Sequence, residues 1–188
     1  MVILASASPR RRELLKQIVN DFKIITADID EEISYVLSPL DAVKDIAKRK
    51  GEKIHLEHPN DLVISADTIV VLDNKIIGKP VDAEDAKKIL RDLSGKIHQV
   101  ITAYCLFQGD EFVEHYVIST VEFNKLSDEL INKYVASGSP LDKAGAYGVQ
   151  DNDRFPIVKE VKGSMTNVIG FPVEEIKEDF IKMNKTSN

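Results

Sequence analysis

The chain has little of what marks secreted, membrane-bound or nucleic-acid-binding proteins. Its 188 residues include one cysteine, Cys105, so no disulfide can form within the chain, and we expect a reducing compartment, the cytoplasm. No apolar run approaches membrane-spanning length, and the first residues lack the charged-then-apolar order of a signal peptide. The net charge of −6 gives no excess of lysine and arginine, so direct nucleic-acid binding is not expected.

Several familiar catalytic patterns are also missing. The four histidines show no zinc-ligand spacing, and the Gly95-Lys96 pair lacks the rest of a phosphate-binding P-loop. No GxSxG serine motif occurs. Cys105 lies among apolar residues of a predicted strand, where packing is the expected role.

Apolar periodicity predicts an α/β protein. We expect a single domain over residues 1–188, built on a mixed central sheet flanked by helices, with a β-hairpin lobe. The hairpin turns at Gly109-Asp110. The expected strands are 2–6, 22–29, 62–72, 98–107, 111–123, 155–162 and 166–169, and the expected helices are 9–19, 38–54, 82–95, 127–138 and 172–183.

Three arginines stand at the start of the first predicted helix. Ser8 and Pro9 are typical N-cap and first-turn residues, so Arg10, Arg11 and Arg12 fall in the first turn, where the helix dipole is already positive. A bound polyphosphate would reverse that local disadvantage. The alternative is a solvated basic turn, which we favour for Arg12, whereas the pattern favours an anion site for Arg10 and Arg11.

A lysine interrupts the apolar side of the second predicted helix. Lys50 lies near the centre of the stripe formed by Val43, Ile46, Ala47 and Ile54. It either points inward, where a buried ammonium needs a partner, or lies at the edge of the stripe and extends to water. Periodicity alone leaves both alternatives open.

An acid interrupts the longest predicted strand. Asp67 separates the apolar residues 62–64 from the apolar residues 69–71. A carboxylate there must be paired, bound to a metal, or exposed at a strand end, where ligands bind in open α/β sheets. The alternative is a carboxylate that caps a turn; we favour the functional interpretation.

Three further features are weaker on their own. Lys79 stands between Gly78 and Pro80 and would by itself be a surface lysine. Glu31 lies in the acidic run 28–32, which is a solvated loop or supplies a magnesium ligand. The glycine-rich stretch 142–150 is able to bring backbone close to a ligand.

Taken together, five segments resemble the Maf family of nucleotide pyrophosphatases. They are ILASASPRRRELL, SADTIVVL, GKP, LSGKIHQVITA and LDKAGAYGVQ, which occur in this order between about Val2 and Pro172. The resemblance implies two lobes around a central cleft, related in shape to inosine triphosphate pyrophosphatases. It also implies a cytoplasmic homodimer that depends on a divalent cation, Mg²⁺ or Mn²⁺.

The resemblance assigns roles to particular residues. It makes Asp67 the general base that activates water. The residues it implies for substrate binding are Ser6, Arg10, Arg11, Glu31, Lys50 and Lys79. The residues it implies for the specificity of the subgroup acting on dTTP and UTP are Arg11, Thr68 and Gln150. It leaves the metal ligands unassigned, with Glu31 and Asp67 as candidates.

The activity implied is hydrolysis of dTTP and UTP, or of modified pyrimidine nucleotides, to the monophosphate and pyrophosphate. One alternative is a pyrophosphatase for 7-methyl-GTP or purine triphosphates on the same scaffold. Another is a non-catalytic regulator, since the family is also associated with arrest of septum formation. The joint presence of Lys50, Asp67 and Lys79 favours the enzyme.

One stretch departs from the family pattern. After Gln150 the family usually has a glycine-containing turn, whereas this chain has residues 151–154, DNDR. Asparagine and aspartate tolerate turn conformations, so we expect the loop to close.

Overall fold

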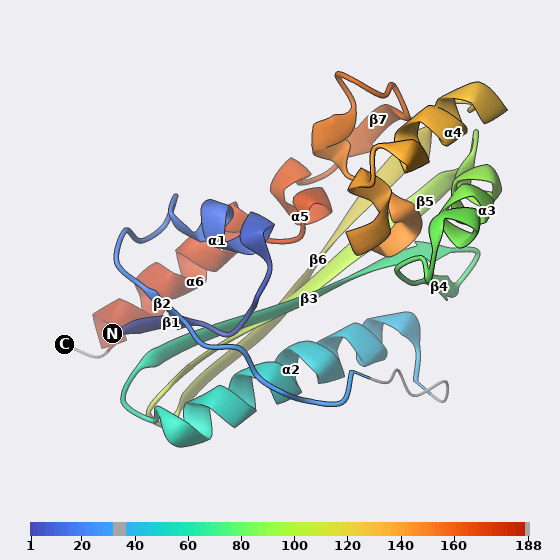
Figure 1. Cartoon of the computed structure of the whole chain (residues 1–188). Coiled ribbons are helices and arrows are strands. Elements are labelled where there is room, and N and C mark those ends of the chain that lie inside the picture. The colour runs from blue at the N-terminus through green and yellow to red at the C-terminus, as the bar shows by residue number, and fades with distance from the viewer. Residues whose placement is uncertain (32–36, 187–188) are drawn as a thin grey trace. The chain divides into compact units, whose positions relative to one another are not determined.

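The computed structural model describes residues 1–31 and 37–186, and the chain forms two compact units. Unit 1 comprises Met1–Asp67, Thr102–Val117 and Gly170–Asn188, and unit 2 comprises Thr68–Ile101 and Ile118–Ile169. The division falls inside three strands, between Asp67 and Thr68, between Ile101 and Thr102, and between Val117 and Ile118. Figure 1 follows the chain through its helices and strands.

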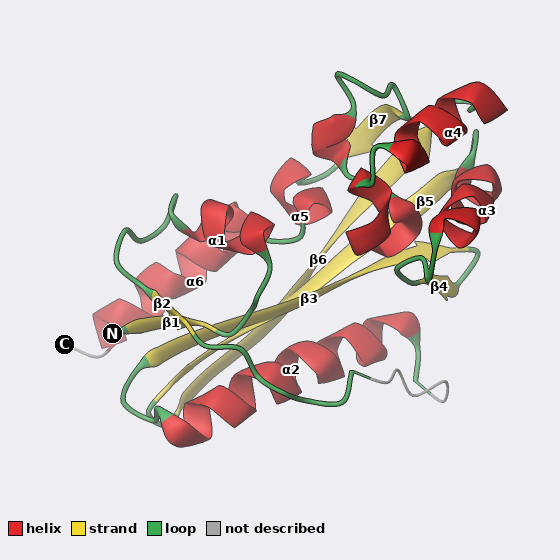
Figure 2. Cartoon of the chain, viewed as in Figure 1, coloured by secondary structure: helices red, strands yellow, loops and turns green. Residues whose placement is uncertain are grey.

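A mixed sheet forms the framework, as predicted. Its strand order is β2-β1-β3-β5-β6-β7, with β4 beside β3. Parallel pairing joins β1 to β2 and to β3, whereas β4 on β3 and β7 on β6 are antiparallel (Figure 2). The strands are β1 Val2–Leu4, β2 Lys23–Ile24, β3 Leu62–Leu72, β4 Lys75–Ile77, β5 Ile97–Gln108, β6 Glu111–Phe123 and β7 Val158–Lys162.

In unit 1, helices cover both faces of the strands. α2 (Pro39–Glu57) lies on one side, and α1 (Pro9–Leu15) and α6 (Val173–Thr186) lie on the other (Figure 1). Two side chains of β5 show that this strand contacts helices on both faces. Phe107 lies against α2, and Tyr104 donates a hydrogen bond to Asp179 of α6. Successive strand residues point to opposite faces, so Tyr104 and Phe107, which are an odd number of residues apart, contact helices on different faces.

In unit 2, α3 (Ala83–Leu93) and α4 (Asp128–Ala136) pack together. The first residue of each predicted helix caps it, because the side chains of Asp82 and Ser127 accept hydrogen bonds from the first helical turn. Three short 3₁₀ turns follow α4, at Ser139–Asp142, Ala144–Ala146 and Val149–Asp151.

Two predictions about local structure were wrong. Residues 166–169 were expected as a strand but belong to a short helix, α5 (Met165–Ile169). Gly163, with φ of 106°, follows β7, and the Ser164 hydroxyl then accepts a hydrogen bond from Asn167 N–H, which closes a helical turn. The strand expected over 22–29 pairs only at Lys23–Ile24, because its partner β1 is itself only three residues long.

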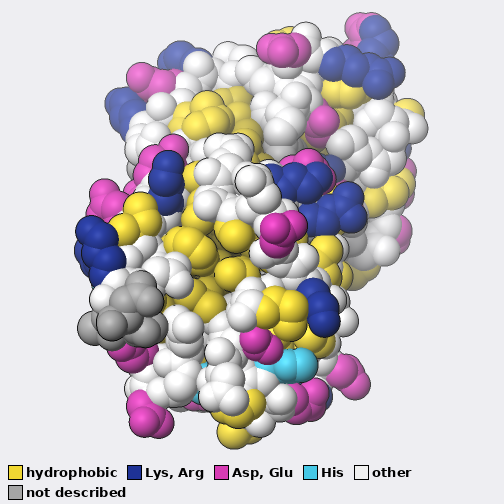
Figure 3. All heavy atoms as spheres, turned by 90° about the vertical axis from the view of Figure 1, so that its left-hand side faces the viewer, with side chains coloured by type: hydrophobic (Ala, Val, Ile, Leu, Met, Phe, Trp, Pro, Cys, Tyr) yellow, Lys and Arg dark blue, Asp and Glu magenta, His cyan; other side chains and the backbone are white. Residues whose placement is uncertain are grey.

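The surface carries charges of both signs. Figure 3 shows hydrophobic side chains gathered in the middle of one face, with basic and acidic side chains around them. Within the described ranges, none of the helices is both long enough and apolar enough to cross a membrane.

Candidate active site

Lys50 points inward from α2, which decides between the two alternatives that its spacing left open. The stripe of Val43, Ile46, Ala47 and Ile54 is buried, and Lys50 in its centre is only 9% exposed. The apolar stripe therefore packs on the sheet, and the Lys50 ammonium lies on the same inward side of the helix.

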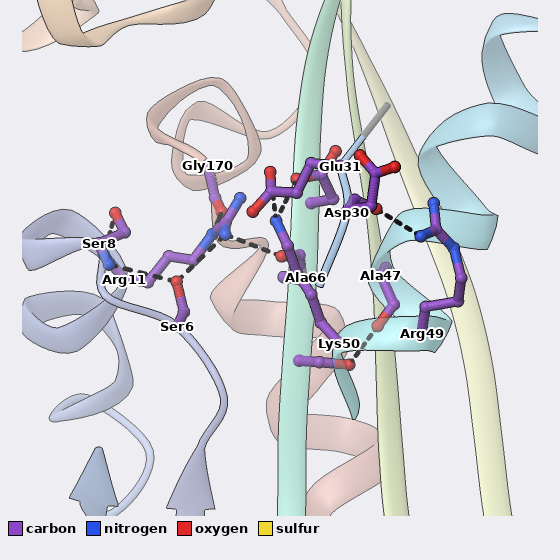
Figure 4. Close-up of polar contacts among 12 residues, drawn as sticks. Ser6, Ser8, Arg11, Asp30, Glu31, Ala47, Arg49, Lys50, Ala66 and Gly170 are labelled. Carbon is purple, nitrogen blue, oxygen red and sulfur yellow. Dashed lines mark hydrogen bonds and ion pairs between the residues drawn. The ribbon is translucent and has the colours of Figure 1, made fainter. Parts of the chain in front are cut away.

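Two carboxylates neutralise this lysine. Its Nζ lies 3.0 Å from Oδ1 of Asp67 and 3.0 Å from Oε2 of Glu31 (Figure 4). The Asp67 side chain is 14% exposed, and the Glu31 side chain is 57% exposed. Charge pairs near the edge of a protein interior interact more strongly than pairs in bulk water, so this cluster holds Asp67 in a defined position.

Asp67 lies at the one break in the burial of β3. Asp67 and Thr68 are partly exposed, whereas every other residue of this strand is buried. The acid is therefore accessible along an otherwise buried strand, as the functional interpretation of its position requires.

Basic side chains of α2 also hold the segment that carries Glu31. Lys53 Nζ donates to the backbone carbonyl of Asp28, and Arg49 Nη1 donates to the carbonyl of Asp30 at 2.5 Å (Figure 4). With the Lys50–Glu31 ion pair, these contacts attach the acidic run to the helix. Glu32, the last residue of the predicted acidic run, lies outside the described residues.

Arg11 is bound by backbone carbonyls from distant parts of unit 1. Its Nη1 donates to Ala66 O at 2.8 Å and to Ser6 Oγ at 3.3 Å, and its Nε donates to Gly170 O at 2.9 Å (Figure 4). Burial lowers the pKa of Arg11, and the charge of nearby Asp67 opposes that shift. Because Ala66 immediately precedes Asp67, Arg11 helps to fix the backbone of the predicted general base.

The other two arginines of this turn differ in exposure. Arg12 is exposed, and its Nε lies 3.5 Å from Oε1 of Glu13, as the solvated alternative requires. Arg10 is partly buried, and its charge contributes to the lowered pKa of Arg11. The Ser8 hydroxyl caps the helix by accepting from Arg11 N–H at 3.4 Å.

Unit 2 carries the remaining predicted site residues, Thr68, Lys79 and Gln150. A hydrogen bond of 3.0 Å from Gly145 N–H to Gly78 O joins the loop of Lys79 to the glycine-rich stretch that ends at Gln150. Gly145 has φ of 70°, and a Cβ there would lie 2.9 Å from Cγ2 of Val70. The glycine thus allows close packing on β3, two residues beyond Thr68. Lys79 and Gln150 are both exposed.

Unit 2 also contains a polar network that sequence patterns did not single out. Oδ2 of Asp151 accepts hydrogen bonds from the Tyr134 hydroxyl at 2.7 Å and from Ser139 Oγ at 2.6 Å. The Tyr134 hydroxyl also accepts from Gly148 N–H at 2.9 Å. The only signal in the sequence was the departure from the family pattern that begins at Asp151.

Two carboxylates of unit 1 are the candidate ligands for a metal ion. Among the described residues there is no cluster of three or more His, Cys, Asp or Glu side chains with metal-binding geometry. Glu31 and Asp67 nevertheless both lie 3.0 Å from the same Lys50 Nζ. Magnesium is often held by one or two carboxylates together with substrate phosphates, so the carboxylates of Glu31 and Asp67 have the chemistry of such ligands.

Comparison with known families identifies the class to which this fold and these residues belong. The family model described as Maf-like protein matches residues 1–183. The chain therefore belongs to the Maf-like family.

Its relatives in this family include proteins named dTTP/UTP pyrophosphatase. That of Thermococcus onnurineus is 42% identical over 174 residues, 93% of each chain. That of Fusobacterium nucleatum is 42% identical over 184 residues, 97% of this chain and 95% of the relative. That of Clostridioides difficile is 44% identical over 177 residues, 93% and 91% of the two chains. Among solved structures, the Staphylococcus aureus Ham1 protein matches with a TM-score of 0.48 and 13% identity, over 82% of this chain and 90% of that chain.

Proposed function

We propose that this protein hydrolyses dTTP and UTP to the nucleoside monophosphate and pyrophosphate. The observation that carries the proposal is the inward Lys50, whose ammonium lies between the carboxylates of Asp67 and Glu31. This cluster fixes the position of the Asp67 carboxylate, and phosphoryl chemistry depends mostly on positioning and on neutralising charge. The names of the relatives support the same activity.

In the proposed reaction, Asp67 orients a water molecule and accepts its proton as the oxygen attacks the α-phosphorus. A bond forms between the water oxygen and the α-phosphorus, and the bond to the oxygen that bridges to the β-phosphorus breaks. Pyrophosphate leaves with the electron pair of that bond. Lys50 holds the Asp67 carboxylate in place, and Arg11 holds the backbone at Ala66.

The substrate brings a large negative charge, which needs several cations. Arg10, at the start of α1, and Lys79, in the loop after β4, would bind phosphate oxygens, and Ser6 would support that contact through its hydroxyl. Glu31 and Asp67 would hold the divalent cation, Mg²⁺ or Mn²⁺, which supplies further charge neutralisation when bound.

The base would be recognised by Gln150, Thr68 and Arg11. The Gln150 amide both donates and accepts, which suits the alternating carbonyl and N–H groups of uracil and thymine. A site built to pair that edge leaves polar groups unmatched when another base binds, and such mismatches discriminate strongly.

A substrate panel tests the proposal. Pyrophosphate release is measured with dTTP, UTP, CTP, ATP, GTP and 7-methyl-GTP, in Mg²⁺ and in Mn²⁺. We expect dTTP and UTP to be cleaved well ahead of the others, and Gln150→Glu to reduce that preference because a carboxylate cannot donate to a carbonyl. Preference for a purine triphosphate would contradict the pyrimidine assignment, and no release from any nucleotide would favour a regulator.

We further propose that the enzyme works in the cytoplasm as a homodimer and removes unwanted nucleotides from the pool. The family resemblance supports the compartment, the dimer and the role in the nucleotide pool. Sedimentation of the purified protein at several concentrations tests the dimer, and a monomer at every concentration would contradict it.

A further inference from the structure

A buried tyrosine hydroxyl lies at the centre of the network around Gln150. Tyr134 belongs to α4 and has no exposed surface. Its hydroxyl donates to Oδ2 of Asp151 at 2.7 Å and accepts from Gly148 N–H at 2.9 Å. Burial, together with the Asp151 carboxylate, raises the pKa of Tyr134, so the hydroxyl keeps its proton and remains a donor.

These contacts hold the backbone on both sides of Gln150. Gly148 precedes it by two residues, and Asp151 follows it directly. Asp151 is bound a second time, by Ser139 Oγ at 2.6 Å. Lys143 closes the network, because its Nζ bonds Ser139 Oγ at 3.1 Å and pairs with Asp142 at 2.8 Å. The short loop is thus anchored at each end to α4 and the turn after it.

The side chain of Gln150 also rests on this anchored segment. A Cβ added at Gly148 would lie 2.9 Å from Oε1 of Gln150 and 2.8 Å from Cε of Lys143. The amide therefore packs directly against the glycine backbone that Tyr134 holds. Gln150 is exposed, so the backbone of its loop and this contact with Gly148 are what place its amide.

We propose that Tyr134 and Asp151 are positioning residues that orient Gln150, and that they thereby set the preference for uracil and thymine over other bases. The inference rests on the proposed function and adds residues that do not contact the base. It also accounts for the departure at Asp151: where the family usually has a glycine-containing turn, this chain fixes the loop with a carboxylate bound by two hydroxyls.

The test compares kcat and KM for UTP and CTP in single variants. Tyr134→Phe removes the hydroxyl and keeps the ring. We expect the ratio of kcat/KM for UTP to that for CTP to fall about tenfold, mainly through a higher KM for UTP, since a hydrogen bond to a charged group is lost. Asp151→Ala should act alike, whereas Asp151→Asn, which keeps an acceptor oxygen, should restore much of the ratio.

Tyr104→Phe is the matched control. Tyr104 is likewise fully buried and donates to the carboxylate of Asp179 at 2.8 Å, but both residues belong to unit 1. Tyr104→Phe should lower the melting temperature about as much as Tyr134→Phe does, and it should leave the ratio of kcat/KM for UTP to that for CTP unchanged. If both tyrosine variants lose activity equally on UTP and CTP, the network is only structural and the inference is overturned.

Gln150→Glu separates this inference from the proposed function. If it lowers the ratio while Tyr134→Phe and Asp151→Ala do not, the positioning role fails and the proposed function stands. If Gln150→Glu leaves the ratio unchanged, base recognition by Gln150 is wrong, and the inference that depends on it is wrong as well. Should Tyr134→Phe fail to fold, Asp151→Ala, altered at a partly exposed residue, decides the result.

Discussion

At the residue scale, the cluster of Lys50, Asp67 and Glu31 explains why charged groups lie along buried elements. A buried ammonium is costly unless it is paired, and here two carboxylates pair with it at 3.0 Å. The same pairing holds the Asp67 carboxylate in a fixed orientation, which its proposed role as a base requires. Two single-residue variants test these roles separately.

Asp67→Asn should leave the fold intact and lower kcat by about 10²–10⁴, because an amide cannot accept the proton of the attacking water. Steady-state pyrophosphate release, with circular dichroism to verify folding, provides the measurement. Asp128→Asn is the control and should leave turnover unchanged, since that exposed acid pairs only with Arg91 among the ion pairs of the described residues, at 3.0 Å. Near-normal turnover in folded Asp67→Asn would remove Asp67 from the mechanism.

Lys50→Ala should lower kcat/KM by about 10², because the cation that positions Asp67 is lost. Its melting temperature should change little, since the desolvation cost of the ammonium is removed together with the ion pairs, and the carboxylates of Asp67 and Glu31 both keep some contact with water. Lys48→Ala, which alters a lysine that is 45% exposed and lies 3.7 Å from Glu52, should leave turnover unchanged. Equal losses in the two variants would argue against a specific role for Lys50.

At the element scale, the start of α1 combines a helix N-terminus with basic side chains. The exposed N–H groups and the dipole of the first turn attract anions, and cations placed there are locally unfavourable. For Arg11, this unfavourable placement of a positive charge is offset by hydrogen bonds to the carbonyls of Ala66 and Gly170 and by the nearby negative charge of Asp67. Arg12 is compensated by Glu13 at the surface.

Arg10→Ala should largely abolish the rise in melting temperature that pyrophosphate or dTTP produces. A ligand that binds only the folded state stabilises it by mass action, and Arg10 is proposed to supply that binding. Thermal unfolding with and without ligand measures the shift. Arg12→Ala should preserve it, because Arg12 is exposed and paired with Glu13. A similar loss in both variants would indicate a diffuse basic patch.

At the scale of the whole molecule, one buried histidine leads us to expect that global stability depends on pH. His98 of β5 is 2% exposed, and its ring packs edge-on against Phe123 at 4.9 Å. Its Nε2 lies 2.7 Å from the Tyr147 hydroxyl. Burial lowers the pKa of His98 to about 4.

The depressed pKa means that the neutral ring stabilises the fold fully above about pH 6.5, the pKa expected in the unfolded chain. As pH falls from there towards 4, the His98 ring becomes protonated in the unfolded chain but stays neutral in the folded protein. The free energy of unfolding therefore falls by up to about 3 kcal/mol. Urea unfolding of the wild type and His98→Gln at pH 7 and pH 4.5 measures this. The variant should be less stable at pH 7 but less sensitive to acid, and an unchanged sensitivity would contradict the assignment to His98.

The sequence by itself determined the elements whose signals are local. The bounds of β3 follow from an apolar run, and the helix starts at Ser38, Asp82 and Ser127 follow from short-range capping hydrogen bonds, so both could be predicted. The helix over residues 165–169 was missed, because a glycine of positive φ and one serine hydroxyl outweigh apolar strand propensity there. Ordered motifs carried the family assignment, since they combine several independent local signals.

Tertiary structure alone decided which side chains meet. Periodicity left Lys50 either inward or at the edge of its stripe, and only the packing of α2 on the sheet brought it to Asp67 and Glu31. The carbonyls that bind Arg11 are separated from it by 55 and 159 residues, and Asp151 is bound by a tyrosine 17 residues earlier. Such contacts form when elements pack, and no local pattern encodes them, because their energy depends on burial and distance in the folded chain.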